Sequence, residues 1–229
     1  MTPRLLARLA GVLYFLTHVT SVAAVALYGG SGIDPDAVLS SRQSVLAGAL
    51  LDIVLAVAVV GTAVALYPLV QTSSPGVAIG YLALRTLEAS VIVTGAVLIL
   101  AAVARPATEA ATALDAGSVT ALRLLHEWTF LIGPGLVVPV HTVLLAWFLR
   151  RRGLVPRFIP VLGLVGGPLV GVMNLGVMFG FTGVLPLAVV PVFAWEITLA
   201  GYLVVRGLRD DPSTPRVSPT RLDRSPACG

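Results

Sequence analysis

The sequence contains few charged side chains and no lysine, so its permanently basic residues are all arginines. Only 11% of the 229 residues are charged, whereas 57% are hydrophobic. This balance excludes an ordinary water-soluble domain and is typical of an integral membrane protein. The single cysteine, Cys228, excludes a disulfide framework or a cysteine metal site within one chain.

Motifs of the common enzyme classes are also missing. The sequence has no Gly-x-Ser-x-Gly elbow, phosphate-binding loop, dinucleotide fingerprint or CxxCH haem motif. His126 and His141 are about 22 Å apart along a straight helix, which is too far for one metal ion. We therefore expect no metal, no cofactor and no enzymatic activity. An intramembrane redox or hydrolytic enzyme is the minor alternative, with Ser90 as a candidate nucleophile by sequence position alone.

The net charge of +4 does not indicate nucleic-acid binding. The arginines gather beside hydrophobic segments, as membrane topology requires, and no long polar segment is present to recognise a macromolecule. The expected partners are therefore the lipid bilayer and a small molecule or ion, with a membrane-protein partner left open.

Long apolar runs are what the sequence does contain. A membrane-spanning helix needs about 20 mainly apolar residues. Six segments qualify: 8–29, 44–70, 77–104, 119–149, 157–180 and 184–207. The expected fold class is all-α, a polytopic transmembrane bundle of six helices. The fourth segment is too long for a straight span, and Gly133, Pro134, Gly135 and Pro139 predict a kink in it.

The first segment allows two interpretations. Arg4, Arg8 and a later Ala-Val-Ala could belong to a cleavable signal peptide. Against that, the apolar run contains Tyr14 and His18 and is longer than a signal peptide needs. We favour a retained first helix.

Arginine placement predicts the orientation of the bundle. One side carries Arg4, Arg8, Arg150, Arg151, Arg152, Arg157, Arg206, Arg209, Arg216, Arg221 and Arg224. The other side has Arg42, Arg105 and Arg123, mixed with Asp34, Asp36, Glu109 and Asp115. Because cytoplasmic segments are rich in basic residues, both termini are predicted to be cytoplasmic. The abundance of Ala, Val, Leu and Arg suggests a bacterial source, so we expect the bacterial cytoplasmic (inner) membrane.

The chain divides into a transmembrane domain over residues 1–208 and a tail over residues 209–229. The tail combines proline, serine, threonine, arginine and aspartate and has no apolar period. It cannot bury enough apolar surface to order itself, so we predict a disordered cytoplasmic tail.

Glycines spaced four apart predict close contacts between helices. The pairs are Gly76 with Gly80, Gly167 with Gly171, and Gly176 with Gly180. The fifth segment is therefore expected to pack most closely.

Eight ionisable side chains lie in or at the ends of the apolar segments. They are His18, Asp52, Arg85, Glu88, His126, Glu127, His141 and Glu196. A charge at membrane depth costs a few to more than ten kcal/mol unless it is paired or hydrated. Such residues are functional candidates, although an internal ion pair can also serve structure alone.

Depth along the helices predicts a polar site near the middle of the membrane. Arg85 and Glu88 are three residues apart and can pair on one helix face. Counting residues from the segment ends places His18 and Glu196 at a similar depth. One arginine cannot neutralise two carboxylates, so a carboxyl is protonated, or His18 or a bound cation balances it.

A second polar group is predicted nearer the outer surface. It consists of Asp52, His126 and Glu127, with Arg123 four residues before Glu127 and able to pair with it. These residues form either a vestibule that collects cations or protons, or an interfacial set near water. His141 is expected to lie alone toward the cytoplasmic side.

Several stretches resemble an uncharacterised bacterial membrane family, domain of unknown function 4386. They are residues 7–14 (ARLAGVLY), 85–89 (RTLEA), 126–135 (HEWTFLIGPG), 153–159 (GLVPRFI) and 195–196 (WE). The family often has His-Asp-Trp where this chain has His126, Glu127 and Trp128. The resemblance implies a six-helix membrane protein and brings no substrate, reaction or cofactor.

The leading functional hypothesis is transport or sensing of a small solute, ion or proton at a polar site made by His18, Arg85, Glu88 and Glu196. The alternative is a non-catalytic membrane partner or assembly subunit whose buried charges only fix its fold.

Overall fold

The computed structural model describes residues 1–28, 42–103 and 115–209, and all regular secondary structure in these ranges is helical. The elements are α1 (Pro3–Leu27), α3 (Arg42–Gln71), α4 (Pro75–Ala102), α5 (Ala116–Ile132), η1 (Gly133–Val137), α6 (Val138–Arg152), α7 (Phe158–Met178) and α8 (Pro186–Val205). Six helical stretches of the described chain are long and apolar enough to cross a membrane, with α5, η1 and α6 forming one of them. The prediction of an all-α protein with six spans is confirmed. The predicted tail, residues 209–229, lies outside the described residues except for Arg209.

The first helix begins five residues earlier than the apolar run suggests, at Pro3. The Thr2 hydroxyl accepts a hydrogen bond from the backbone N–H of Leu5 at 3.3 Å, which satisfies one of the free N–H groups at the helix start. Pro3 at the first helical position costs no hydrogen bond, because a backbone N–H at this position would have no partner within the helix. Polar capping, which hydropathy does not detect, therefore sets this boundary.

The fourth span stays helical throughout but changes its hydrogen-bonding pattern at residues 133–137, which form the π-helical segment η1. Pro134 and Pro139 have no N–H to donate to the preceding turn, so the regular ladder is interrupted on both sides of Gly135. A single π turn absorbs this interruption without ending the helix. At the position of the predicted kink, the helix is widened locally between α5 and α6.

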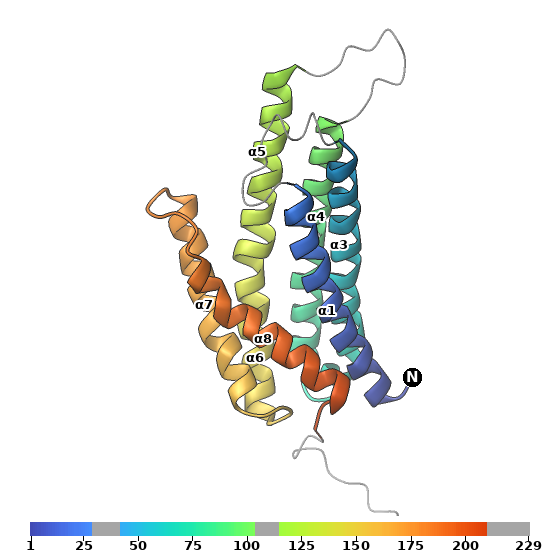
Figure 1. Cartoon of the computed structure of the whole chain (residues 1–229). Coiled ribbons are helices and arrows are strands. Elements are labelled where there is room, and N and C mark those ends of the chain that lie inside the picture. The colour runs from blue at the N-terminus through green and yellow to red at the C-terminus, as the bar shows by residue number, and fades with distance from the viewer. Residues whose placement is uncertain (29–41, 104–114, 210–229) are drawn as a thin grey trace, which may run out of the picture.

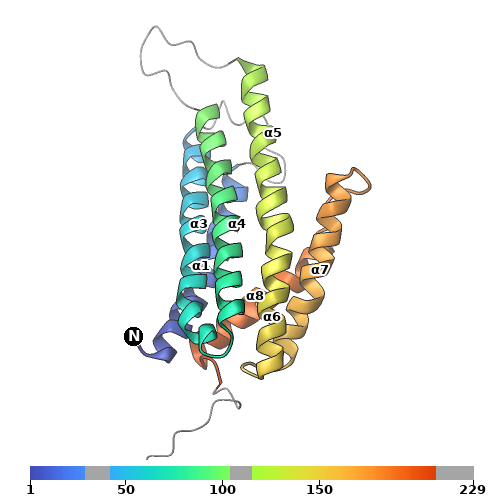
Figure 2. The ribbon, with the colours of Figure 1, turned by 180° about the vertical axis from the view of Figure 1, so that it is seen from behind.

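The six spans form a closed ring. Each span contacts its neighbours in sequence, from α1 to α3 and α4, through α5 and α6, to α7 and α8, and α8 in turn contacts α1. Figures 1 and 2 show α1, α3 and α4 on one side and α7 on the other, and in Figure 1 α8 crosses in front of the bundle from α7 to α1. Side chains that face inward from α1, α4, α6 and α8 therefore share one interior.

Small residues allow the closest approaches in this ring. A Cβ at Gly166 on α7 would lie 2.4 Å from the backbone nitrogen of Val192 on α8. A Cβ at Gly11 on α1 would lie 2.7 Å from the carbonyl oxygen of Ala200 on α8. Backbone contacts of this kind are typical of membrane helices, which gain little from excluding lipid and rely on packing.

The predicted glycine pairs have different outcomes. Gly167 and Gly171 pack against Pro139 of α6, as expected for a tightly packed fifth span. The prediction is wrong for Gly76, because a Cβ there would meet nothing within 4 Å, whereas a Cβ at Gly80 would lie 3.4 Å from Leu144 of α6. Gly76 lies in the first turn of α4, at the end of the bundle, where no neighbouring helix covers it.

Candidate intramembrane polar site

Arg85 and Glu88 of α4 form a buried ion pair inside the ring. The Nη1 atom of Arg85 lies 3.0 Å from the Oε2 atom of Glu88, and the residues are 2% and 4% exposed. Their spacing of three places both side chains on the same helix face. The predicted pairing is confirmed.

Two neighbouring helices complete this pair. The Nε2 atom of His141 on α6 lies 2.9 Å from the same Oε2 atom of Glu88. The Nη2 atom of Arg85 donates to the hydroxyl of Thr62 on α3 at 3.1 Å. Thr62, Arg85, Glu88 and His141, here called the core cluster, thereby connect three helices.

The expectation that His141 lies alone is wrong. His141 is eleven residues from the end of α6, and Glu88 is thirteen residues from the start of α4 at the same end of the bundle. At 1.5 Å rise per residue these depths are about 17 and 20 Å, so the side chains meet. Counting residues from the end of the apolar run placed His141 too close to the cytoplasmic end, because α6 runs on to Arg152, beyond that run.

Two tyrosines flank the Arg85 guanidinium. Its central carbon lies 5.1 Å from the ring centroid of Tyr14 on α1 and 5.8 Å from that of Tyr81 on α4. The two tyrosine hydroxyls are hydrogen-bonded to each other. Cation–π contacts in such a desolvated place contribute about 2 kcal/mol, so the rings replace part of the hydration that Arg85 loses.

The core cluster carries no net charge when His141 is neutral. The Glu88 carboxylate can only accept, so both Arg85 and His141 donate to it, and the neutral His141 ring then carries its proton on Nε2. Two buried atoms of the cluster, the Nδ1 atom of His141 and the Nε atom of Arg85, have no hydrogen-bond partner. The cluster is therefore balanced in charge and incompletely satisfied in hydrogen bonding.

His18 and Glu196 form a second pair, between α1 and α8. The Nε2 atom of His18 lies 3.2 Å from the Oε2 atom of Glu196, and the side chains are 10% and 17% exposed. The Nδ1 atom of His18 donates to the carbonyl oxygen of Tyr14 at 2.8 Å, because a carbonyl can only accept. The proton that this pair can lose is therefore the one between Nε2 and the carboxylate.

Tyr14 contacts both groups. Its carbonyl oxygen accepts from His18, and its ring covers the guanidinium of Arg85. The four residues predicted for the midplane site thus form two adjacent pairs, His18 with Glu196 and Arg85 with Glu88, and no direct contact between the pairs is among their described hydrogen bonds and ion pairs. Their role as a functional site stays a prediction.

The predicted outer group separates into two places. The hydroxyl of Tyr28 donates to Oδ2 of the buried Asp52 at 2.6 Å, and the Tyr28 ring meets the ring of His126 edge to face, with 5.2 Å between the centroids. His126 donates through Nδ1 to the carbonyl of Gly95 at 2.9 Å. Glu127 is instead exposed on the outside of α5, because adjacent helical residues point about 100° apart.

Glu127 lies 3.9 Å from Arg123, a loose pair on the surface of α5. The pairing anticipated from their spacing of four is therefore present. The other partners of the site gave weaker signals in the sequence. Thr62 is one hydroxyl within an Ala- and Val-rich run, and Tyr28 stands at the end of its segment.

Proton exchange is the chemistry that these groups can perform. In the described part of the chain, no three His, Cys, Asp or Glu side chains come together as metal ligands would. The expectation that the protein binds no metal or cofactor stays a prediction. Histidine and carboxylate side chains in hydrogen-bond contact can hold or release a proton, and the His18–Glu196 pair is the less deeply buried of the two places where they meet.

Fold and site together define a multi-pass helical membrane protein with buried ionisable pairs. The model of the family described as Domain of unknown function (DUF4386) matches residues 9–207, and the chain belongs to this family. No curated protein and no solved structure matches the chain.

Proposed function

We propose that this protein is a proton-linked transporter or sensor of a bacterial cytoplasmic membrane, and that His18 and Glu196 carry the exchangeable proton. The observation that carries the proposal is the contact between these two side chains, 3.2 Å apart and partly exposed, beside a core cluster that is already neutral. A proton, a cation or a small solute is the ligand.

Charge balance supports this choice. With one proton between them, His18 and Glu196 have no net charge, whichever of the two holds it. When the proton leaves, one negative charge remains within the span of α8, which costs a few kcal/mol or more. The protein must then bind a cation, admit water or shift α8 against α1. Loss of a proton is thereby coupled to binding or to conformation.

Exposure separates the roles of the two pairs. Arg85, Glu88 and His141 are 2%, 4% and 1% exposed, so their protons exchange only if the ring opens. The His18 and Glu196 side chains retain 10% and 17% of their surface. We assign proton exchange to the accessible pair and positioning of Tyr14 to Arg85.

The orientation belongs to the same proposal. An even number of spans brings the N-terminus and residue 209 to one end of the bundle, as Figure 1 illustrates. That end carries Arg4, Arg8 and Arg206 together with the arginines of the α6–α7 turn. The positive-inside rule then places it in the cytoplasm.

Proteoliposomes test the proposal. With an imposed pH gradient and a potassium ionophore to balance charge, the wild type is expected to show either faster proton entry than empty vesicles or pH-dependent fluorescence of Trp195, the neighbour of Glu196. Glu196→Gln should abolish the response, because an amide cannot release a proton. Glu127→Gln, which removes an exposed carboxyl from α5, is the matched control and should respond like the wild type. Equal behaviour of the wild type and Glu196→Gln in both measurements would contradict the proposal.

A structural role is the second candidate, and the deep burial of the core cluster favours it. Three helices meet at the buried Arg85–Glu88 pair, through Thr62 of α3 and His141 of α6, which is what an assembly subunit with internal ion pairs would need. This candidate predicts that Glu88→Gln lowers protein abundance while Glu196→Gln has no effect on flux or fluorescence. Co-purification of a stoichiometric membrane partner would support it.

A further inference from the structure

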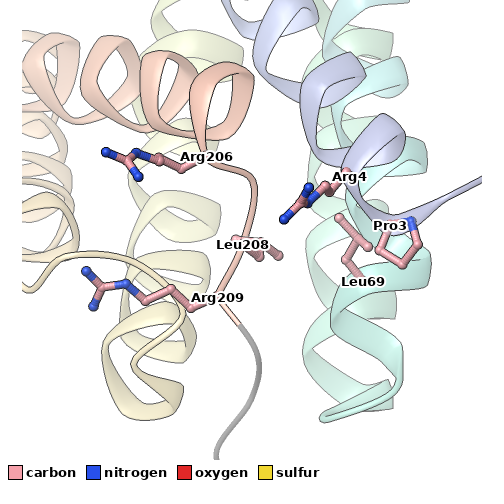
Figure 3. Close-up of a pocket in the computed structure, with 6 residues that line it drawn as sticks. All are labelled: Pro3, Arg4, Leu69, Arg206, Leu208 and Arg209. Carbon is pink, nitrogen blue, oxygen red and sulfur yellow. The ribbon is translucent and has the colours of Figure 1, made fainter.

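A recess lies at the arginine-rich end of the bundle, where α1 begins, α3 ends and the chain leaves α8. It is lined by Pro3, Arg4, Leu69, Arg206, Leu208 and Arg209 and has a volume of about 460 Å³ (Figure 3). Pockets of about 300–1,000 Å³ accommodate small ligands. This basic recess is separate from the polar groups described above and does not depend on the proposed function.

Local backbone geometry builds the recess. Gly207 adopts a positive φ of 73°, and its N–H bonds to the carbonyl of Leu203, which ends α8 in the manner of a left-handed cap. The N–H of Arg209 then donates to the carbonyl of Leu154 in the α6–α7 turn at 2.9 Å. The segment that carries Arg206 and Arg209 is therefore fixed to the bundle.

The guanidinium groups stand on both sides of this segment. In Figure 3, Arg206 and Arg209 extend to one side and Arg4 lies on the other, with Leu208 between them. All three arginines are exposed. None of them is in an ion pair with a carboxylate of the described residues. Their donors are thus available to an external anion.

The position of the recess selects the kind of anion. It lies at the ends of helices that are long and apolar enough to cross a membrane, and the polar headgroups border the hydrocarbon core that such helices span. Pro3, Leu69 and Leu208 give it an apolar part. Guanidinium groups bind phosphate with paired hydrogen bonds, and basic pockets between membrane helices are suited to anionic headgroups. The start of α1 adds the positive end of a helix dipole.

We infer that the basic recess binds the headgroup of an anionic phospholipid through its phosphates. Arg206 and Arg209 hold one phosphate and Arg4 contacts the other side, so a headgroup with two phosphates, as in cardiolipin, engages both sides at once. Phosphatidylglycerol, with one phosphate, binds more weakly, and zwitterionic phosphatidylcholine binds least.

Lipid retention by the purified full-length protein tests the inference. Delipidated protein is incubated with vesicles of phosphatidylcholine alone or with added phosphatidylglycerol or cardiolipin, and bound lipid is counted by native mass spectrometry. Arg206→Gln/Arg209→Gln is expected to lower the affinity for cardiolipin on the order of a hundredfold, because each arginine loses its charge-assisted hydrogen bonds to phosphate. Arg150→Gln/Arg157→Gln removes the same charge at the same end, outside the recess, and should lower it much less.

Two results would overturn the inference. One is an equal loss of cardiolipin in both double variants, which would mean general surface attraction and no site. The other is inorganic phosphate or glycerol phosphate raising the melting temperature as much as cardiolipin does and displacing it, which would assign the recess to a soluble anion. Retention of cardiolipin by the control, its loss from the recess variant, and no effect of free phosphate would support it.

Discussion

Arg85 illustrates how this bundle keeps a permanent charge away from water. The guanidinium has a carboxylate partner in Glu88, a hydroxyl acceptor in Thr62, and the rings of Tyr14 and Tyr81 at 5.1 and 5.8 Å from its central carbon. Without such partners, a buried ion would cost several kcal/mol. Because the partners come from α1, α3 and α4, the charge also fixes how these helices are rotated relative to one another.

Removing one member of this ion pair should destabilise the protein more than removing both. Arg85→Met is expected to lower the free energy of unfolding by roughly 3–5 kcal/mol, because Glu88 stays buried beside a neutral His141. Arg85→Met/Glu88→Leu should recover much of that loss, since apolar residues of similar volume replace the pair. Unfolding by SDS in mixed micelles measures both changes.

The exposed Glu127 provides the control for this comparison. Glu127→Leu removes a carboxylate from a loose surface pair and is expected to change the free energy of unfolding by less than about 0.5 kcal/mol. If the double variant lost as much stability as Arg85→Met and Glu88→Leu together, each measured as a single variant, Arg85 and Glu88 would not be energetically coupled.

At the residue scale, the sequence predicts contacts within a helix better than contacts between helices. The Arg85–Glu88 pair follows from a spacing of three on one α-helix, which needs no tertiary information. The bond from His141 to Glu88 depends on where α6 ends and how it is rotated, and no periodicity reports that. The same tertiary arrangement decides which of several hydroxyl groups accepts from Arg85, and it is that of Thr62.

The π segment is the element that matters most for the site. A Cβ at Gly133 would lie 3.2 Å from the Cγ1 atom of Val91 on α4, and one at Gly135 would lie 3.1 Å from Asn174 on α7. The segment thus brings its backbone close to two neighbouring helices at once. The widened turn also shifts the rotation of α6 relative to α5 from that of a regular helix, and His141 beyond it faces the interior.

The α7–α8 contact should be sensitive to a single methyl group. Gly166→Ala places a Cβ against the backbone of Val192, which cannot rotate away as a side chain can. We expect a loss of about 1–3 kcal/mol in the free energy of unfolding, the usual range for overpacking. Gly76→Ala, in open space on α4, is the control and should be neutral or slightly stabilising. SDS unfolding of the two variants would contradict the packing argument if it showed equal stability.

The start of α5 gives a test that depends on pH. The Asp115 carboxylate accepts a hydrogen bond from the backbone N–H of Ser118 at 2.7 Å, and this bond lowers the pKa of Asp115 below its ordinary value. A lowered folded-state pKa means that the cap is fully present above the unfolded-state pKa and is lost as pH falls through the folded-state pKa. The amide of Ser118 should therefore be protected from hydrogen exchange at neutral pH and less so in acid.

Substitutions separate the cap from other causes of protection. Asp115→Ala should expose the Ser118 amide at every pH, because alanine offers no acceptor. Asp115→Asn keeps an acceptor oxygen that does not titrate, so its protection should not change between neutral and acidic pH. Equal exchange of this amide in the wild type and Asp115→Ala at neutral pH would show that the cap does not protect it.

At the scale of the whole molecule, the number of spans was predictable and the closure of the ring was not. A hydropathy profile predicts the number of spans, because each span must cross about 30 Å of hydrocarbon whatever its neighbours are. The contact that closes the ring, from α8 to α1, joins the two ends of the domain through the fit of Gly11 against Ala200 and through the His18–Glu196 pair. Small residues occur throughout the chain, so the sequence does not single out Gly11 and Ala200.

Labelling of cysteines from either side of the membrane tests the orientation of the whole molecule. The sequence has a single natural cysteine, Cys228, near the C-terminus. If both termini are cytoplasmic, a membrane-impermeant maleimide should label Cys228 in inside-out vesicles and leave it unlabelled in intact cells. Ala121→Cys in a Cys228→Ser background should show the reverse, because Ala121 is exposed near the start of α5, at the opposite end of the bundle. Labelling of Cys228 in intact cells would show that the orientation is the opposite of the predicted one. The arginines of the basic recess would then lie against the outer leaflet.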